Sequence, residues 1–591
     1  MIEDYINRES VIRLLIKQRC KFAAQINQCN VLFSVVKHNQ LNHKSTDSEH
    51  ETIYKLFPQR SKWVVVGRQR DSNGKYKRRK SLNQVDRNQK ALWFTYLKAK
   101  NDNNTQEWYV KLINYADDIV KKALSNSYRF SKPTVKAIEK ETDKKQKTII
   151  CRPICSFGLD DRLIASLYNK CLTSVLDSLF YEKSYAFRKC QQDDHTFAHL
   201  KAVKNIKDFR QEHKNKNLWV AECDMKSFYD TIDHNVIKNR FCLLLRESLS
   251  KGIINDSEYL ILKRVMFSYI DCFNFKNDVL IYNKIQSHHI WSPIKKGKKS
   301  CFRCTFKWIE EYLVKKIKNR EQRRKYIRQL GVPQGGALSG LIANCMMHFV
   351  DMKLKKYWEN NSDFCYIRFC DDMIMIGVSE DAVKNAFEDY KKAIDNSQLY
   401  RHNSKSIIAT MKDFWNAKTR EPYMWGKLDT NVFPWITFVG YDFNWEGETR
   451  IRRKTYKKEI EKQYNKMAEL KKILEKRDGT IAPIKKSLYI YRSLYKRLIG
   501  MSVGRFHLRN YQTADNNMSW AQAFTELTPN KWSKAQLRNL DRHRTYVMYM
   551  FKKFLEQNKE NFENVKSDGS PNPDPYYFGK PFSYYYQVFK K

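Results

Sequence analysis

Residues 364–377 constrain the fold more than any other segment, because two apolar runs there flank the adjacent carboxylates Asp371 and Asp372. Short apolar runs on either side of a turn favour two β-strands, so a hairpin is predicted with both aspartates at its tip. Burial of neighbouring carboxylates costs several kcal/mol unless cations neutralise them. Two interpretations satisfy this constraint: a cation-binding site, or a surface turn in which both aspartates are solvated.

A second segment, residues 218–234, begins with an apolar strand that ends at Asp224, and a helix is predicted to follow. A carboxylate at a strand end, placed beside the two at the hairpin tip, would make an all-oxygen site. Such a site suits two Mg²⁺ ions, with Mn²⁺ as an alternative, and would be completed only when nucleotide phosphates bind. Two metals of this kind activate a primer 3′-hydroxyl and stabilise the leaving pyrophosphate.

The third segment, residues 329–340, is rich in glycine and precedes an apolar helix predicted over residues 341–356. Glycines allow the backbone to approach a substrate closely. Gln334, which precedes Gly335, could bond a nucleotide or a template edge. Taken alone, the segment is equally explained as the cap of the helix that follows.

The charge of the chain indicates a polyanionic partner. Lys and Arg number 110 against 64 Asp and Glu, which gives a net charge of +46. Nucleic acid is the expected partner. Membrane is not expected, since no apolar run approaches the ~18 residues of a spanning helix. The acidic N-terminus lacks a signal-peptide pattern, so a cytoplasmic location is predicted, and the 14 scattered cysteines are interpreted as reduced thiols.

In this order, the three segments resemble the reverse transcriptase family. The palm of that family carries an aspartate at a strand end, a Gly-x-Pro-Gln-Gly segment and an aromatic-x-Asp-Asp hairpin. These correspond here to Asp224, residues 331–335 and residues 369–372. Further similarities lie at Arg152-Pro153, Asp161-Arg162, residues 184–188, Asn344, Asp351, Lys405 and residues 438–441. The resemblance covers about residues 147–455 and is greatest to bacterial enzymes of the group II intron-like and retron lineage, above all defence-associated (abortive-infection and unknown-group) reverse transcriptases.

The resemblance implies an α+β fold of the right-hand polymerase type, with fingers, palm and a mostly helical thumb, plus helical N- and C-terminal extensions. The expected domains are 1–140, a basic and mostly helical N-terminal extension; 141–223, fingers and the start of the palm; 224–450, palm with a basic insertion at about 272–326; 451–565, helical thumb and C-terminal helices; and 566–591, a Pro-rich linker with an aromatic basic tail.

The activity implied is RNA-directed DNA polymerisation from deoxynucleotide triphosphates. Residue roles carried over from the family are metal binding by Asp224, Asp371 and Asp372; proton donation to pyrophosphate by Lys405; triphosphate binding by Lys147 and Arg152; exclusion of a ribose 2′-hydroxyl by Tyr229; and nucleotide contacts by Gln334 and Gly335. Three positions depart from the family pattern: Phe369 replaces the usual Tyr, Gly340 a frequent Pro and Ala186 a usual Gly. The first removes a hydroxyl near the primer end.

The relatives also imply partners: an RNA template, expected to be a dedicated noncoding RNA in antiviral defence, and a DNA product. The primer is left open, as is assembly into a homo-oligomer or with a partner protein. The alternatives are a retron-type reverse transcriptase and a maturase-like RNA-binding protein that needs no synthesis. The intact aspartates argue against the latter, and the bulky Tyr229 argues against an RNA-templated RNA polymerase.

Outside these motifs, four segments carry weaker predictions. Trp63 to Val66 is a strand candidate before a hairpin turn at Asn73-Gly74. Cys301 and Cys304, with His288 and His289 upstream, form a single Cys-x-x-Cys pattern, which favours ordinary thiols over zinc. The basic residues 450–458 are interpreted as a thumb gripping a duplex rather than a merely solvated face. Tyrosines 584–586 could prime synthesis through a hydroxyl, stack on single-stranded product, or pack onto the thumb, and packing is favoured.

Overall fold

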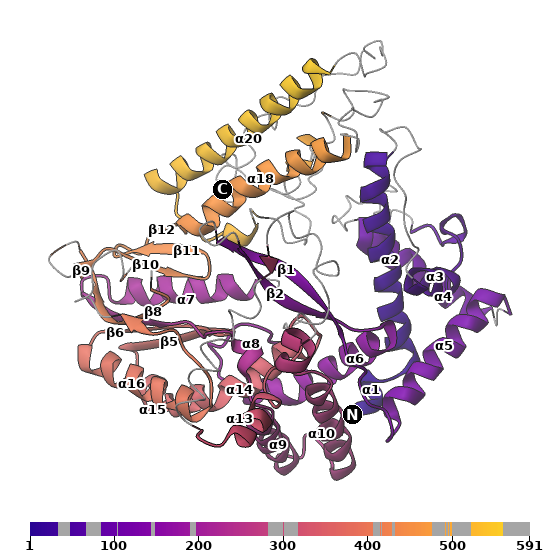
Figure 1. Cartoon of the computed structure of the whole chain (residues 1–591), viewed down its shortest axis with the longest axis horizontal. Coiled ribbons are helices and arrows are strands. Elements are labelled where there is room, and N and C mark those ends of the chain that lie inside the picture. The colour runs from indigo at the N-terminus through magenta and orange to yellow at the C-terminus, as the bar shows by residue number, and fades with distance from the viewer. Residues whose placement is uncertain are drawn as a thin grey trace, which may run out of the picture. The chain divides into compact units, whose positions relative to one another are not determined.

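The structure is a computed structural model, and it describes residues 1–33, 48–66, 84–102, 105–143, 148–189, 197–281, 299–300, 317–405, 414, 417–427, 429, 432–474, 491, 494–495, 497–498, 520 and 522–558. The chain divides into two compact units. Unit 1 comprises Met1–Val11 and Tyr115–Pro434, and unit 2 comprises Ile12–Asn114 and Trp435–Lys591. In the described part of the chain, helices precede residue 134, helices and strands both occur in residues 134–451, and helices follow (Figure 1).

Unit 1 holds most of the helices. They are α1 (Ile2–Tyr5), α6 (Leu159–Leu176), α7 (Ala198–Glu212), α8 (Phe228–Thr231), α9 (His234–Ser250), α10 (Asp256–Asp271), α13 (Arg320–Ile327), α14 (Ser339–Lys353), α15 (Lys355–Trp358) and α16 (Glu380–Asn396), with the 3-10 turn η3 (Asp177–Leu179) and the π-helix η4 (Lys276–Ile281). Helices α2 (Arg8–Phe33) and α5 (Glu107–Leu124) run from one unit into the other. Asn255 begins α10 with a capping box, in which its side chain and that of Glu258 each accept from the other residue's backbone.

A six-stranded sheet forms the centre of unit 1. Its strands are β3 (Leu218–Cys223), β5 (Phe364–Phe369), β6 (Asp372–Gly377), β7 (Ser404–Lys405), β8 (Thr419–Trp425) and β9 (Val432–Phe433). The order is β5-β6-β3-β8-β7, with β9 paired to β8. Strands β5, β6, β3 and β8 are mutually antiparallel neighbours, whereas β7 and β9 run parallel to β8. Helix α16 packs on β3, β6 and β8 (Figure 1), so the central strands are buried.

The predicted hairpin is confirmed as β5 and β6. Phe369 pairs with Asp372 across a two-residue turn of Cys370 and Asp371. Both strands are almost wholly buried, although β5 is at the edge of the sheet. Cys370 has a φ of 61°, a left-handed conformation that is costly for a residue with a Cβ atom.

A second sheet of unit 1 has the order β1-β2-β4, from β1 (Thr134–Asp143), β2 (Thr148–Ser156) and β4 (Lys299–Ser300). The Gly-rich segment docks on its middle strand. Ile154 forms a bridge with Gln334, and the Cys155 N–H donates to the Gln334 carbonyl at 2.8 Å. Residues that lie far apart in the sequence are therefore joined by backbone hydrogen bonds near the strand-end aspartate.

Unit 2 contains α3 (Ser48–Lys55), η2 (Arg60–Lys62), α4 (Gln84–Asn101), α18 (Arg453–Leu474), η5 (Gln522–Phe524) and α20 (Lys531–Gln557), and the sheet β10 (Trp435–Phe438), β11 (Tyr441–Asn444) and β12 (Thr449–Ile451). Helices α18 and α20 pack through a cluster that includes Met467, Leu470, Val547 and Phe551. Helix α18 lies within residues 451–565, the segment predicted to be helical.

One local prediction is wrong. Residues 63–66 form no strand: the Trp63 indole donates to the Pro58 carbonyl, and the Val64 N–H donates to the Thr95 hydroxyl. Val65 is 88% exposed. β-branched residues favour strands only where a partner strand and a packing surface are present. The turn at 73–74, the cysteine pair at 301 and 304, and the tyrosines at 584–586 lie outside the described residues.

Candidate active site

Strand register brings two of the predicted carboxylates together. Strand β3 pairs antiparallel with β6, and the last pair is Cys223 with Met373. The next residues along that register are Asp224 and Asp372, at the end of the sheet where the hairpin turns. Asp371 lies in the turn itself. The register therefore places the three aspartates at the same end of two adjacent strands.

The electrostatics of this strand end confirm that the carboxylates influence one another. The pKa of Asp371 is raised, first by burial and second by the negative charge of Asp224, while the positive charge of Arg152 acts in the opposite direction. Two cationic or ionisable groups adjoin Asp224. Its Oδ2 lies 3.3 Å from Lys418 Nζ and 3.9 Å from His402 Nε2. Lys418 Nζ and His402 Nε2 are themselves 3.2 Å apart.

The lysine that contacts Asp224 is Lys418, and it is a different residue from Lys405, for which the resemblance implies proton donation to pyrophosphate. Lys405 is an exposed residue of the short strand β7, where it pairs with Arg420. Lys418 directly precedes β8, whose neighbour in the sheet is β3. Sequence analysis missed Lys418, because nothing local shows which strand will pair with the strand that ends at Asp224.

A fully buried ion pair joins the β5–β6 hairpin to helix α14. Arg368 and Asp351 both have 0% side-chain exposure. The guanidinium donates from Nε to Asp351 Oδ1 at 2.9 Å and from Nη2 to Oδ2 at 2.7 Å. Its Nη1 donates to the Cys370 carbonyl at 2.9 Å. The Tyr366 hydroxyl also donates to Asp351, at 2.7 Å. Arg368 thus links helix α14 to the strained residue of the aspartate turn.

The nucleotide-binding candidates lie on the elements around the aspartates. Arg152 is an exposed residue of β2, the strand on which Gln334 is docked. Gly335 has a φ of 95°, which few residues other than glycine adopt, and an added Cβ would lie 3.1 Å from Ile154 Cγ2. Lys147 lies outside the described residues.

Tyr229 connects two of the three motif segments. Its hydroxyl lies 3.4 Å from Cys370 Sγ in the aspartate turn, and its carbonyl accepts from the Val332 N–H at 2.9 Å in the Gly-rich segment. Burial raises the pKa of the Tyr229 phenol, so the ring is neutral at physiological pH. Tyr229 therefore lies beside the aspartate turn.

The donor set at this site consists of carboxylate oxygens, which suits Mg²⁺. Among the residues that the structure describes, no group of three or more His, Cys, Asp or Glu side chains is gathered closely enough to hold a metal ion by itself. Protein carboxylates commonly supply only part of a magnesium coordination sphere, with water and substrate phosphates completing it. The residues present therefore fit a metal that binds together with its substrate.

The site thus combines carboxylates at a strand end with a Gly-rich segment and cationic side chains. Residues 281–443 match the protein family described as reverse transcriptase (RNA-dependent DNA polymerase). The match includes the Gly-rich segment and the hairpin and begins after Asp224. Residues 281–443 therefore carry a reverse transcriptase domain, which agrees with the prediction of an RNA-directed DNA polymerase.

Solved structures to which this chain is similar include telomerases. They include a telomerase from Candida tropicalis truncated from its C-terminal domain (17% identity, TM-score 0.32, 55% of each chain covered), apo telomerase from Candida tropicalis (13%, 0.35, 74% of this chain and 63% of that one), and telomerase from Candida albicans with a TWJ fragment of telomeric RNA (13%, 0.30, 86% and 78%). The chain spans 55% of the length of the first of these. No curated protein matches the sequence.

Proposed function

We propose that unit 1 copies RNA into DNA by two-metal nucleotidyl transfer, with Asp224, Asp371 and Asp372 as the metal ligands. The observation that carries the proposal is the β3–β6 register, which sets Asp224 beside the aspartate turn. When bound, two Mg²⁺ ions would activate the primer 3′-hydroxyl and stabilise the leaving pyrophosphate. The chain's own residues bind and orient the substrates around that centre.

Cationic residues flank the carboxylates from different elements. Lys418 contacts Asp224 directly, and the charge of Arg152 reaches Asp371. We infer that Arg152 holds the triphosphate, because a guanidinium matches phosphate oxygens bidentately. Lys418 partly neutralises Asp224 before substrate arrives. Tyr229 sits where the sugar ring would lie, so a 2′-hydroxyl would meet its ring.

The nucleic acid itself would be held by the basic elements. Helix α18 starts with Arg453 and Lys454 and has no acidic residue in its first turn. Cations at a helix N-terminus are unfavourable because they face the positive end of the macrodipole. A bound phosphate backbone removes that penalty. We therefore assign α18 to nucleic-acid binding, the role predicted for a thumb within a palm, fingers and thumb arrangement.

The finer role comes from the resemblance alone. It predicts a cytoplasmic enzyme that copies a dedicated noncoding RNA in antiviral defence. Among the described helices, none is both long and apolar enough to cross a membrane. Copurification of the protein with its nucleic acid, followed by sequencing of the bound RNA, tests the template prediction: a single enriched RNA supports it, and a random RNA population contradicts it.

The activity is tested by Asp371→Asn, which removes one ligand charge without changing side-chain size. Incorporation of deoxynucleotides on a primed RNA template should fall by about three orders of magnitude, since a catalytic metal supplies several kcal/mol to the transition state. The matched control is Asp381→Asn, an exposed carboxylate on α16. Wild-type incorporation by folded Asp371→Asn would refute the assignment.

Thermal unfolding gives a second readout that does not depend on turnover. The raised pKa of Asp371 shows that its ionised form is disfavoured in the folded protein, so Asp371→Asn should melt at a higher temperature than wild type without metal. Mg²⁺ with a deoxynucleotide triphosphate should raise the wild-type melting temperature, by linkage of binding to folding, and should raise that of the variant less.

A further inference from the structure

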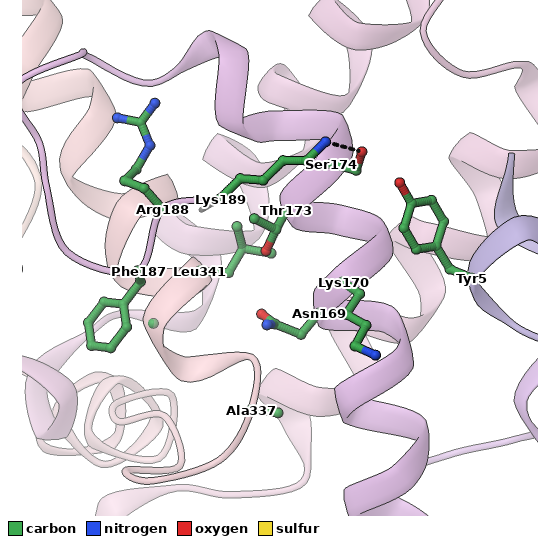
Figure 2. Close-up of a pocket in the computed structure, with 11 residues that line it drawn as sticks. Tyr5, Asn169, Lys170, Thr173, Ser174, Phe187, Arg188, Lys189, Ala337 and Leu341 are labelled. Carbon is green, nitrogen blue, oxygen red and sulfur yellow. Dashed lines mark hydrogen bonds between the residues drawn. The ribbon is translucent and has the colours of Figure 1, made fainter. Parts of the chain in front are cut away.

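A cavity of about 380 Å³ lies in unit 1 between three separate parts of the chain. Its walls are a face of α6, residues 187–189 and the junction of the Gly-rich segment with α14, and Tyr5 of α1 closes one side. Figure 2 shows Phe187 and Tyr5 on opposite sides of this cavity, with Asn169 and Thr173 between them. The volume falls within the range of small-ligand sites, about 300–1,000 Å³.

The cavity wall is cationic. Three lining residues are basic, Lys170, Arg188 and Lys189, and no lining residue is acidic. Arg188 is neutralised by Asp177, with its Nε 2.8 Å from Asp177 Oδ1, and it also donates to backbone carbonyls. Lys170 and Lys189 are both exposed side chains at the cavity. Lys189 Nζ donates to the Ser174 hydroxyl at 3.2 Å, so its ammonium group lies over α6 (Figure 2).

Phe187 is an aromatic residue of the cavity wall, and its backbone has an unusual conformation. Its φ is 58°, in the left-handed region, and its side chain is 54% exposed. A bulky side chain at positive φ costs of order 1–3 kcal/mol and persists where surrounding structure enforces it. Burial does not explain the conformation, because the ring is more exposed than buried. Strain that holds an aromatic ring toward solvent points to a ligand that stacks on it.

Gly340 provides the space that the ring occupies. A Cβ atom added at this glycine would lie 2.5 Å from Phe187 Cγ and 3.0 Å from its Cβ. The helical residue Gly340 is thus needed for the close approach of the ring to α14. Glycine inside a helix destabilises it by roughly 0.5–1 kcal/mol relative to alanine. Helix formation alone would therefore not favour glycine at position 340.

Two hydrogen bonds connect the residues before Phe187 to α14 and β5, the elements next to the aspartate turn. The Asn344 amide donates to the Ala186 carbonyl at 2.9 Å, next to Phe187. The Tyr185 N–H donates to the Arg368 carbonyl at 3.0 Å, on β5, the strand that leads into the aspartate turn. A ligand on Phe187 therefore sits on the same rigid frame as the candidate active site.

We propose that this cavity binds one nucleotide of a single-stranded nucleic acid, with its base stacked on Phe187 and its phosphate beside Lys170 and Lys189. Proteins that bind single strands combine cationic side chains with an aromatic ring. Every base offers a π-face to the ring, and every nucleotide linkage carries a phosphate for the cations. Asn169 and Thr173 add uncharged hydrogen-bonding groups for the sugar or base edge. The proposal rests on the proposed function, since it supplies a contact for a strand that reaches the aspartates.

The test uses full-length protein and primer–template duplexes whose single-stranded RNA overhang carries 2-aminopurine at one position at a time. At one position the fluorescence should change on binding, as expected for stacking on an aromatic ring. Phe187→Leu should abolish that change and weaken overhang binding about tenfold, whereas Phe187→Tyr, which keeps a ring, should retain both. Phe187 is exposed, so neither variant removes a core side chain.

A second pair of variants tests the charges. Replacement of Lys170 and Lys189 by Ala should weaken overhang binding and make the log-log salt slope less negative by about 0.7, equivalent to one single-strand phosphate. The matched control replaces Lys384 and Lys392, both exposed on α16, and should leave affinity and slope unchanged. Blunt duplexes should bind the wild type and the Lys170/Lys189 variant alike.

The outcomes are separable from failure of the proposed function. Overhang binding that is identical in wild type, Phe187→Leu and the Lys170/Lys189 variant overturns the cavity proposal, even if Asp371→Asn is inactive. A second result also overturns the cavity proposal. If these variants lose affinity for a free deoxynucleoside monophosphate but bind the overhang as wild type does, the cavity binds a free nucleotide instead. Incorporation that survives Asp371→Asn refutes the polymerase site but not the single-strand contact.

Discussion

At the residue scale, the conformation of the aspartate turn depends on the buried side chain of Arg368. Cys370 adopts a left-handed conformation between the hairpin strands, and the Arg368 guanidinium holds its carbonyl. The same guanidinium is paired with Asp351, and both side chains are fully buried. A buried ion pair adds little net stability over apolar residues, yet removal of one partner is costly. We infer that Arg368 positions Asp371 and Asp372 without contacting the reacting atoms.

Arg368→Lys tests this role, because it keeps the charge but removes the fork that reaches Asp351 and Cys370 together. We expect a loss of about 2–4 kcal/mol in the free energy of unfolding, near the cost of breaking a buried pair. We also expect a lower kcat at temperatures where the variant is folded, with unchanged RNA affinity. Arg323→Lys is the control, since the Arg323 guanidinium donates to the backbone carbonyls of residues 317 and 318. A normal kcat in folded Arg368→Lys would limit Arg368 to a structural role.

At the element scale, the Gly-rich segment is held by its neighbours rather than by its own glycines. His234, the first residue of α9, contacts the Gly331 carbonyl through Nε2 at 2.7 Å, and its N–H donates to the Gln329 carbonyl at 2.8 Å. The Gly331 N–H donates to the Ile232 carbonyl at 2.9 Å. Helix α9 thus anchors the start of the segment, while β2 anchors Gln334.

This anchor predicts a pH dependence of stability. Burial lowers the pKa of His234 below its ordinary 6.5, despite opposing effects of the Gly331 carbonyl and of Asp271. Between the ordinary pKa of 6.5 and the lower pKa of the folded protein, the unfolded chain binds a proton at His234 that the folded chain does not. The free energy of unfolding therefore falls as the pH decreases through this range. Urea unfolding between pH ~7.5 and ~5.5 should show this fall. His234→Gln, which keeps an N–H donor but cannot ionise, should show a smaller one. An equal fall in both proteins would exclude His234 as the group.

At the scale of the whole molecule, the dominant quantity is the net charge of +46. Self-repulsion of that size opposes a compact state and favours any polyanion that neutralises it. Affinity for single-stranded RNA should therefore fall steeply with salt, with a log-log slope of roughly −0.7 per neutralised phosphate. Fluorescence anisotropy over a salt series measures the slope. A flat response would show that the basic surface does not hold the RNA.

Local patterns in the sequence were enough to predict the hairpin and to locate the aspartates and the Gly-rich segment. Apolar runs, a strand end and a glycine cluster each express a backbone preference within a few residues. Helix α18 has the same origin. The strand predicted at residues 63–66 failed because valines favour a strand only when another strand pairs with them, and pairing is not a local property.

Tertiary structure decided which residues from distant segments meet. Only the pairing of β3 with β8 identifies Lys418, rather than Lys405, as the lysine beside Asp224. Only the approach of α14 to residue 187 explains Gly340, whose replacement of proline is an unexplained departure in the sequence alone. The physical reason is that these contacts join residues more than a hundred positions apart in the sequence, so their energy depends on the assembled fold and not on any local preference.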